Sequence, residues 1–471
     1  MCYNFIMNIL QDLPDFLSRN SSALADITLE CPVCGRPHTI PYAHMQVGQG
    51  LIHTLPATAE RLLGRRVARV CVIYDRVIEE LIQQNVIRPL QSSHWQVSTL
   101  PLGAPGVLLD SESEFCDQTS IRVDPRAELL IGAGSGVICD ITKWVATRTG
   151  LPHITYGTAP SMNAYTSITA TITEKDVKIS HLLNPALAVF MDVDIQTQAP
   201  MPMIHAGIGD LAARAICNAD WRLANFIRGA YFCPVPYQMT ASNEARYLAA
   251  AAQIRARDPH ALHELSEAIL ISGLSMTVLG GETSPSSGAE HILSHFWDLL
   301  HHVRDLPKNF HGAQVGVGTG IMLHFYEVMR AYDITRIDPQ EILRRRASLE
   351  QLEQENRRLY GPAATLFDEA VRKKRIPDAD FVPYLTRILK QWDALWQAVA
   401  PYAPPAASIL GPMQEAGVPL TLDSIHRTRA EGLEALVKGP QYRTRYTILD
   451  LAWELGILDE VAEAALDRAT A

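Results

Sequence analysis

The sequence predicts an α/β domain followed by an all-helical domain, and two patterns along the chain indicate this order. Short runs typical of buried strands alternate with helical patterns up to about residue 160. Beyond about residue 200, apolar residues recur three and four positions apart, as in amphipathic helices. The chain has 471 residues, 47% of them hydrophobic, which suffices for two or three domains and excludes a disordered or fibrous protein.

Strand and helix patterns alternate in the predicted α/β domain. We expect strands at 69–75, 95–100, 128–131 and 153–156, and helices at 76–84 and 137–149. Strands separated by helices of this length pair in parallel through right-handed crossovers. Before about residue 40 we expect an irregular lead-in with a hairpin-like segment from Cys31 to His38.

Long amphipathic windows fill the second half of the chain. We expect helices at 208–225, 241–256, 260–274, 289–302, 316–331, 339–358, 383–400 and 446–468. The Pro-rich segment 401–405 is predicted to be a turn. The domains are placed at 1–40 for the lead-in, 41–195 for the α/β domain and 196–471 for the helical domain.

Charge and hydropathy limit the partners and the location that the sequence predicts. The formal net charge is −10, which argues against a large basic surface and therefore against nucleic acid or an anionic membrane as a partner. No apolar stretch approaches the roughly 20 residues that span a bilayer, and the start lacks the basic region of a signal peptide. We expect a cytoplasmic protein whose eight scattered cysteines are reduced.

A glycine-rich loop follows the strand predicted at 128–131 and opens the next predicted helix. Gly132, Gly134 and Gly136 form a Gly-x-Gly-x-Gly pattern, which differs from the usual dinucleotide fingerprint. Such a loop lets backbone N–H groups approach a pyrophosphate, or it is simply a tight turn between strand and helix. Asp75 ends an earlier strand. An acid there accepts a hydrogen bond from an adenosine ribose, or it caps the N-terminus of the next helix.

A histidine pair and an acid in the helical half are candidate metal ligands. His291 and His295 share one helix face, and His311, expected on a later loop, can complete a site; the alternative places these histidines in core or solvent. Glu290 precedes the pair, so this is not the zinc-protease motif. Asp210 begins a predicted helix, either as a cap or as a carboxylate ligand.

The Cys31-Pro-Val-Cys34 segment with His38 offers two thiols and one imidazole. A zinc site needs a fourth ligand, and no second Cys-x-x-Cys supplies it. We interpret the segment as a surface turn that contains cysteines, with a zinc knuckle as the alternative.

Taken in order, the motifs resemble sn-glycerol-1-phosphate dehydrogenases, especially their bacterial branch, and the related glycerol dehydrogenases, iron-type alcohol dehydrogenases and dehydroquinate synthases. The likeness runs from about residue 28 to the closing segment 443–452. It rests on the Gly-rich turn and on the segments Gly157-Thr-Ala-Pro-Ser161, Gly207-Ile-Gly-Asp210, Ser287-Gly-Ala-Glu-His-Ile-Leu-Ser-His295 and His311-Gly-Ala-Gln-Val-Gly-Val-Gly318.

The resemblance implies a Rossmann-like N-terminal domain that binds NAD or NADP, an all-helical C-terminal domain that holds one divalent metal (zinc, nickel or iron), and an active site in the cleft between them. It implies a small phosphorylated ketone as substrate and a homodimer. By position, the implied metal ligands are Asp210, His291 and His311. The implied nucleotide contacts are Asp75, Gly134, Gly136 to Asp140, Thr158 to Ser161, and Ser167. The implied catalytic residues are His295, Asn163 and Asp210.

Two positions depart from the family pattern. Relatives resemble Ser-Met-Asp-Gly where this chain reads Ser161-Met-Asn163-Ala164. Asn accepts a hydrogen bond but cannot act as a base near neutral pH, so the change affects substrate identity or turnover. The segment 280–285 also lacks an Arg that relatives tend to carry, which weakens an implied contact to a substrate phosphate or a neighbouring helix.

The leading hypothesis is reduction of dihydroxyacetone phosphate, or a close ketose phosphate, to sn-glycerol 1-phosphate. The metal polarises the carbonyl, the nicotinamide supplies hydride, and His295 relays a proton. Lys143, after the Gly-rich turn, either binds phosphate or is solvated, with solvation favoured. Two alternatives remain: a cyclase or lyase of the dehydroquinate synthase kind, and a family member that binds nucleotide and metal without turnover.

Overall fold

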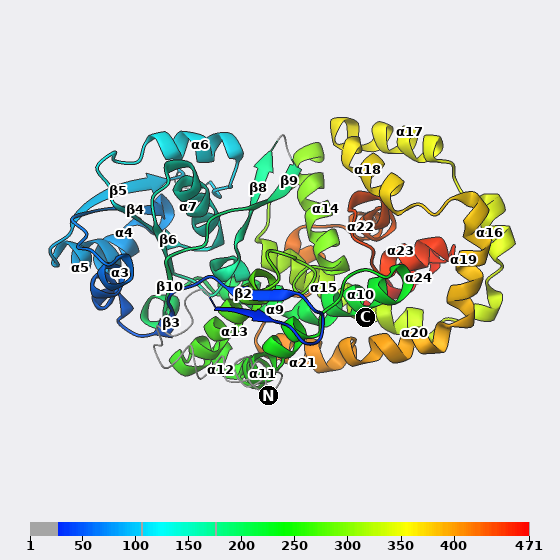
Figure 1. Cartoon of the computed structure of the whole chain (residues 1–471). Coiled ribbons are helices and arrows are strands. Elements are labelled where there is room, and N and C mark those ends of the chain that lie inside the picture. Colours follow the sequence, from blue (N-terminus) through cyan, green and yellow to red (C-terminus); the bar gives the residue numbers. More distant parts are fainter. Residues whose placement is uncertain (1–26, 105–106, 175–176, 471) are drawn as a thin grey trace. The chain divides into compact units, whose positions relative to one another are not determined.

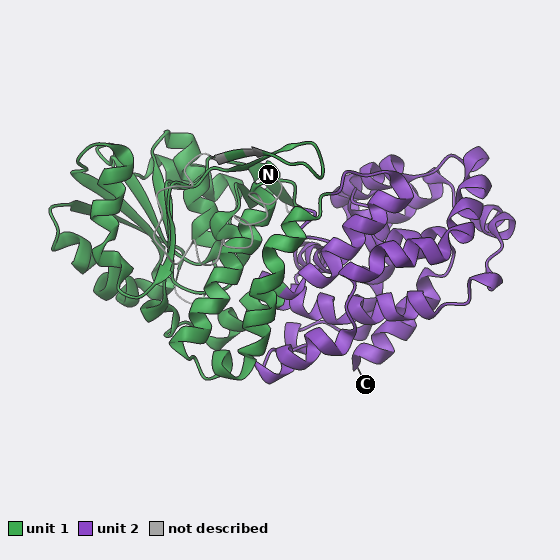
Figure 2. Cartoon of the chain, turned by 60° about the horizontal axis from the view of Figure 1, so that its bottom comes forward, with its two compact units in different colours: residues 1–211, 233–283 green, residues 212–232, 284–471 purple. Residues whose placement is uncertain are grey.

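The computed structural model describes residues 27–104, 107–174 and 177–470, and its chain forms two compact units (Figure 2). Unit 1 comprises 1–211 and 233–283, and unit 2 comprises 212–232 and 284–471. The segment 233–283, which the sequence pattern groups with the helical domain, therefore packs with the α/β part by contact.

A six-stranded parallel sheet organises unit 1 (Figure 1). The strands lie in the order β3 (Met45–Gly48), β10 (Ala188–Asp192), β7 (His153–Gly157), β6 (Leu129–Gly134), β4 (Arg69–Asp75) and β5 (Gln96–Leu102). The predicted parallel pairing is confirmed. Of these six strands, the sequence patterns did not predict β3 and β10, which are short, with 4 and 5 residues, and lie side by side at one end of the sheet.

Helices cover both faces of this sheet (Figure 1). Alternate residues of β4 show why, because Val70, Val72 and Tyr74 enter one apolar core while Cys71 and Ile73 enter the other. The covering helices are α3 (Leu55–Leu63), α4 (Glu79–Ile82) and α5 (Arg88–Gln91) on the first core, and α6 (Ser113–Ile121) and α7 (Gly136–Thr149) on the second.

Several element boundaries in unit 1 differ from the expectation. The helix expected at 76–84 is a 3-10 turn, α4, a π-helical segment and α5 in succession, ending at Gln91. The strand expected at 128–131 continues to Gly134, because the glycine-rich residues still pair with β7. Two antiparallel hairpins complete the strands: β1 (Ile27–Glu30) with β2 (Pro37–Ile40), and β8 (Thr169–Glu174) with β9 (Val177–Leu182).

Helices also form the rest of unit 1. They are α8 (Val193–Gln196), α9 (Met201–Ala212), α11 (Val235–Ala249), α12 (Ala251–Arg255) and α13 (Pro259–Thr277). Helix α13 packs closely on the 3-10 turn η5 (Asn163–Thr166), since a side chain on Gly273 would lie 2.1 Å from the carbonyl oxygen of Asn163. This close contact fixes the position of the Asn163 backbone.

The described part of unit 2 contains helices and no strands. The helices are α10 (Arg214–Arg228), α14 (Ala289–Arg304), α15 (His311–Ala331), α16 (Pro339–Arg345), α17 (Leu349–Tyr360), α18 (Ala364–Lys374), α19 (Asp378–Lys390), α20 (Trp392–Val399), α21 (Ala406–Glu415), α22 (Arg429–Tyr442), α23 (Ile448–Glu454) and α24 (Leu458–Thr470). Helix α14 packs against α15 and α22, which surround it with apolar side chains.

The sequence patterns did not predict α18, α21 and α22. Two of them carry glycine and proline inside the helix, at Gly411-Pro412 and Gly439-Pro440, a pair that ordinarily predicts a turn. The windows 339–358 and 446–468 each break into two helices. Within the described ranges, no helix is both long enough and apolar enough to span a bilayer.

Candidate active site

The glycine-rich turn joins β6 to α7 by close packing. A side chain on Gly134 would lie 2.7 Å from Ile138, and one on Gly136 would lie 1.9 Å from the sulfur of Met162. The N–H of Thr158, at the end of β7, donates to the carbonyl of Gly134. The turn is therefore tight, and it starts α7 at the carboxyl edge of the sheet, where a helix N-terminus favours an anion.

This turn lies at the point where the strand order reverses. Strand β5 pairs with one side of β4 and β6 with the other, so the connection changes direction between β4 and β6. In open parallel sheets, ligands bind outside the carboxyl ends of the strands at such a point. The two strand ends here are Asp75 and Gly134. The Asp75 carboxylate accepts from the Val77 N–H at 3.0 Å, so it acts as a helix cap.

Asp140 and Lys143 form a buried pair on α7. The Lys143 ammonium, 1% exposed, lies 3.3 Å from the Asp140 carboxylate. It also donates to the carbonyls of Ala164 at 2.6 Å and Thr169 at 3.1 Å. The expectation that Lys143 is solvated is wrong, because these three acceptors hold it in the interior. Burial raises the pKa of the Asp140 carboxyl, and the Lys143 charge opposes that rise.

The other implied nucleotide contacts surround the end of β7 and η5. Thr158, Ser161 and Ser167 are all buried. The Ser161 hydroxyl lies 3.4 Å from the phenol oxygen of Tyr165, and the Ser167 hydroxyl lies 2.7 Å from that of Thr169. These hydroxyls hold the segment in shape, and their role toward a nucleotide stays a prediction.

Asn163 is tied to two helices. Its backbone N–H donates to Oδ2 of Asp210 on α9 at 2.9 Å, and its side-chain amide donates to the Ser272 hydroxyl on α13 at 3.1 Å. Asn163 is buried, and so is Asp210. The side-chain carbonyl of Asn163 can accept a hydrogen bond from a hydroxyl group.

Three imidazoles cluster in unit 2. His291 and His295 lie one turn apart on α14, and His311 is the first residue of α15 rather than part of a loop. The ring centroid of His311 lies 5.1 Å from that of His291 and 5.5 Å from that of His295. The predicted shared helix face is confirmed.

Glu290 orients His291, a role that the sequence analysis did not assign. Its carboxylate lies 2.8 Å from Nδ1 of His291 and accepts from the Gly288 N–H at 2.7 Å. Glu290 has no exposed surface. A carboxylate on Nδ1 leaves Nε2 as the lone-pair nitrogen, which is the usual arrangement behind a metal-binding histidine. The signal in the sequence is an acid directly before the histidine.

Asp210, His291 and His311 meet at short range. One ligand atom from each lies within 4.8 Å of the other two. Nδ1 of His311 lies 3.3 Å from the Ser294 hydroxyl, to which an Nδ1–H can donate when Nε2 binds a cation. One carboxylate and two imidazoles form a donor set that suits a catalytic divalent cation with open positions.

Asp220 on α10 anchors the start of α14. Its carboxylate accepts from the Ala289 N–H at 2.8 Å, the Ile448 N–H at 2.8 Å and the Tyr326 hydroxyl at 2.6 Å. Burial, helped by the nearby Glu290 charge, raises the pKa of Asp220 to about 7. Asp220 thereby ties together three helices around the segment that presents His291.

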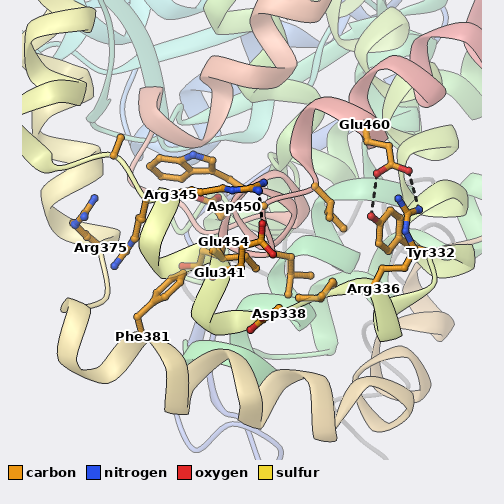
Figure 3. Close-up of a pocket in the computed structure, with 18 of the residues that line it drawn as sticks. Tyr332, Arg336, Asp338, Glu341, Arg345, Arg375, Phe381, Asp450, Glu454 and Glu460 are labelled. Atoms are coloured by element: carbon orange, nitrogen blue, oxygen red, sulfur yellow. Dashed lines mark hydrogen bonds and ion pairs between the residues drawn. The ribbon is translucent and has the colours of Figure 1, made fainter.

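A cavity of about 560 Å³ lies elsewhere in unit 2 (Figure 3). Two of its cationic side chains pair with acids that also line it: Arg336 with Glu460 at 3.2 Å, and Lys374 with Asp450 at 2.5 Å. None of the predicted catalytic, nucleotide-binding or metal-binding residues lines it.

Comparison with known proteins agrees with this architecture. The family model "Iron-containing alcohol dehydrogenase" matches residues 46–200. Among solved structures, a probable glycerol dehydrogenase from Sinorhizobium meliloti aligns over 91% of this chain and 97% of its own, with a TM-score of 0.57 and 16% identity. Glycerol dehydrogenase from Schizosaccharomyces pombe aligns over 96% and 94%, with a TM-score of 0.57 and 14% identity.

Curated relatives are more similar in sequence. Glycerol-1-phosphate dehydrogenase [NAD(P)+] from Halalkalibacterium halodurans is 30% identical over 303 residues, which cover 64% of this chain and 75% of the relative. The protein of the same name from Pyrococcus furiosus is 32% identical over 282 residues, which cover 60% and 78%. The fold is that of the iron-containing alcohol dehydrogenases, a class of oxidoreductases. Within that class, the chain belongs to the glycerol-1-phosphate dehydrogenase family.

Proposed function

We propose that the protein reduces dihydroxyacetone phosphate, or a close ketose phosphate, to sn-glycerol 1-phosphate with NADH or NADPH and a divalent cation. The observation that carries the proposal is the approach of Asp210, His291 and His311 to within 4.8 Å of one another. Membership of the family supports the reaction class. The metal, whether zinc, nickel or iron, is not specified by a set of one carboxylate and two imidazoles.

The residues fit a cation on chemical grounds. The Glu290 carboxylate on Nδ1 fixes the ring of His291, and the Ser294 hydroxyl near Nδ1 of His311 does the same for the second ring. In this proposal the Nε2 atoms of His291 and His311 bind the cation, and Asp210 adds the negative charge. When bound, the cation supplies Lewis-acid polarisation of the substrate carbonyl.

Protein groups near these ligands would position the substrate and move the proton. His295 is mostly buried, but 16% of its side chain is exposed, and through this exposed part the imidazole can exchange a proton with solvent. Asn163 can accept a hydrogen bond from a substrate hydroxyl through its amide carbonyl, and it cannot remove a proton. In this proposal Asn163 orients the substrate and His295 carries the proton.

The edge of the sheet at β4 and β6 would bind the nucleotide. The first turn of α7, from Gly136, presents N–H groups to a pyrophosphate, and Asp75 lies at the strand end where an acid meets the ribose. An acid there disfavours a 2′-phosphate, so NADH is expected to be preferred over NADPH. The nicotinamide supplies the hydride.

The test is a screen of NADH and NADPH oxidation with small phosphorylated ketones, with and without added zinc, nickel or iron. We expect oxidation with dihydroxyacetone phosphate that depends on the metal, and a product that a dehydrogenase specific for sn-glycerol 3-phosphate does not consume. Product formation without net nicotinamide oxidation would favour the cyclase or lyase alternative. Nucleotide and metal binding with no turnover would favour a binding protein. Asn163 is the residue that raises this alternative, because an amide cannot act as a base.

A further inference from the structure

Three cysteines and one histidine converge at the turn between β1 and β2. Cys31, Cys34 and His38 come from the hairpin, and Cys233 comes from the segment just before α11. One ligand atom from each of the four lies within 4.8 Å of the others. Cys31, His38 and Cys233 are buried, which corrects the expectation of a surface turn for all but Cys34.

The separations between these atoms are those of a tetrahedral zinc site. Zinc bonds of about 2.3 Å to sulfur and about 2.0 Å to nitrogen place two sulfurs about 3.8 Å apart, and a sulfur and a nitrogen about 3.5 Å apart. The two sulfurs of Cys31 and Cys233 lie 3.9 Å apart. Nε2 of His38 lies 3.6 Å from the sulfur of Cys34 and 3.5 Å from that of Cys233.

The environment of His38 is that of a metal-bound imidazole. Its Nδ1 lies 3.2 Å from the carbonyl oxygen of Val278, so Nδ1–H donates there and Nε2 faces the sulfurs. The turn itself is shaped for this purpose, because the Gly35 N–H donates to the Cys31 carbonyl and Gly35 has a φ of +69°, which favours glycine. The hairpin thus aims both of its thiols at the same point.

We propose that Cys31, Cys34, His38 and Cys233 bind one zinc ion, as a structural site separate from the active site. Four protein ligands fill the tetrahedron and leave no position for a substrate, which distinguishes a structural from a catalytic site. The ion would tie the β1–β2 hairpin to the start of α11. Cys233, 195 residues beyond His38, supplies the fourth ligand that the hairpin sequence lacks.

A disulfide between Cys31 and Cys233 is the rival arrangement. A disulfide bond is about 2.05 Å long, whereas the two sulfurs here are 3.9 Å apart, and both cysteines are free. A disulfide would also leave Cys34 and His38 without the shared purpose that their geometry indicates. Zinc uses all four groups.

The test is metal analysis of the full-length protein purified under reducing conditions, combined with removal of the proposed active-site ligands. In a His291→Ala/His311→Ala variant we expect about one zinc per chain to remain, because the thiol site does not depend on those histidines. Cobalt exchanged into this variant should show the intense thiolate-to-metal charge-transfer bands that oxygen and imidazole ligands do not give. These two measurements require no change at the thiol site.

Substitution at the thiol site completes the experiment. Cys34→Ser, at the most exposed of the four ligands, and Cys233→Ser should each lower the retained zinc at least about tenfold and remove the charge-transfer bands. Cys116→Ser, a buried cysteine of the same unit, is the matched control and should retain both. Absence of zinc and of thiolate bands in the double-histidine variant, or a Cys31–Cys233 disulfide found by mass spectrometry, would overturn the proposal.

Discussion

The carboxylate of Glu290 lies 2.8 Å from Nδ1 of His291, the next residue in the sequence. Glu290 has no exposed surface. A buried carboxylate in this place keeps the proton on Nδ1 and raises the basicity of Nε2. The same carboxylate accepts from the Gly288 N–H, so it is fixed from two sides. The proposed metal site therefore depends on a residue that is not itself one of its three ligands.

Replacing Glu290 with Gln should weaken metal binding about 10- to 100-fold, because the neutral amide neither orients nor polarises His291 as well. Titration of metal-free protein with zinc or nickel against a chelator of known affinity measures this change. Glu327→Gln is a matched control, since Glu327 lies 3.2 Å from Nδ1 of His324 and neither residue belongs to a candidate metal cluster among the described residues. Equal affinity in the wild type and the Glu290 variant would contradict the assigned role.

Replacing His291 or His311 with Ala should remove the active-site cation and abolish ketone reduction, because either change leaves only two protein ligands. Metal content and NADH oxidation are measured on the same samples. The zinc that remains in the His291→Ala/His311→Ala variant is subtracted as the contribution of the Cys31 site. Full occupancy of an active-site cation in both variants would refute the ligand assignment.

Changing Asn163 to Asp should raise the rate on dihydroxyacetone phosphate by about tenfold or more, because it restores the charged acceptor that relatives carry at this position. The Ser272 hydroxyl, which now accepts from the Asn163 amide, can turn to donate to the new carboxylate. Steady-state kcat and KM report the effect. An unchanged or lower rate would indicate a pocket adapted to a different ketone.

Replacing Lys143 with Met should destabilise the protein by about 3 kcal/mol or more, because it leaves the Asp140 carboxylate buried without its partner. Urea unfolding measures the loss, and Lys373→Met on an exposed face serves as the control. A loss as small as that of the control would show that the pair contributes nothing to stability.

Asp220 predicts a pH dependence of stability. Its pKa is about 7 in the folded protein and close to 4 when unfolded, so between these values the folded state holds a proton that the unfolded state has released. This contribution to the free energy of unfolding is present at low pH and is lost as pH rises from about 4 to about 7. Relative to Asp220→Asn, metal-free wild type should therefore lose stability from pH 5 to pH 8 in urea unfolding. A difference that stays constant with pH would contradict the raised pKa.

Sequence patterns predicted the strands that run through the middle of the sheet, because β4, β6 and β7 are apolar runs between recognisable helices. They did not predict β3, whose 4 residues owe their strand form to pairing with β10. Helices with internal glycine and proline, such as α22, were also missed, since packing against α14 overrides the local preference.

The sequence also predicted only part of the candidate site. Asp210, His291 and His311 followed from motif order and resemblance, but Glu290 and Asp220 act through contacts that only the fold creates. Cys233 is the clearest case, because nothing near it in sequence indicates that it meets Cys31. Lys143 was expected in solvent, but it is buried, and its ammonium group donates to backbone carbonyls in the interior.

The most direct test of the central claim is anomalous diffraction from crystals of the protein grown with zinc or nickel, recorded on both sides of the metal absorption edge. We expect an anomalous peak bonded to Asp210 and to Nε2 of both His291 and His311, at about 2.0–2.2 Å from each atom. A fully loaded protein with no peak among these three side chains would contradict the account.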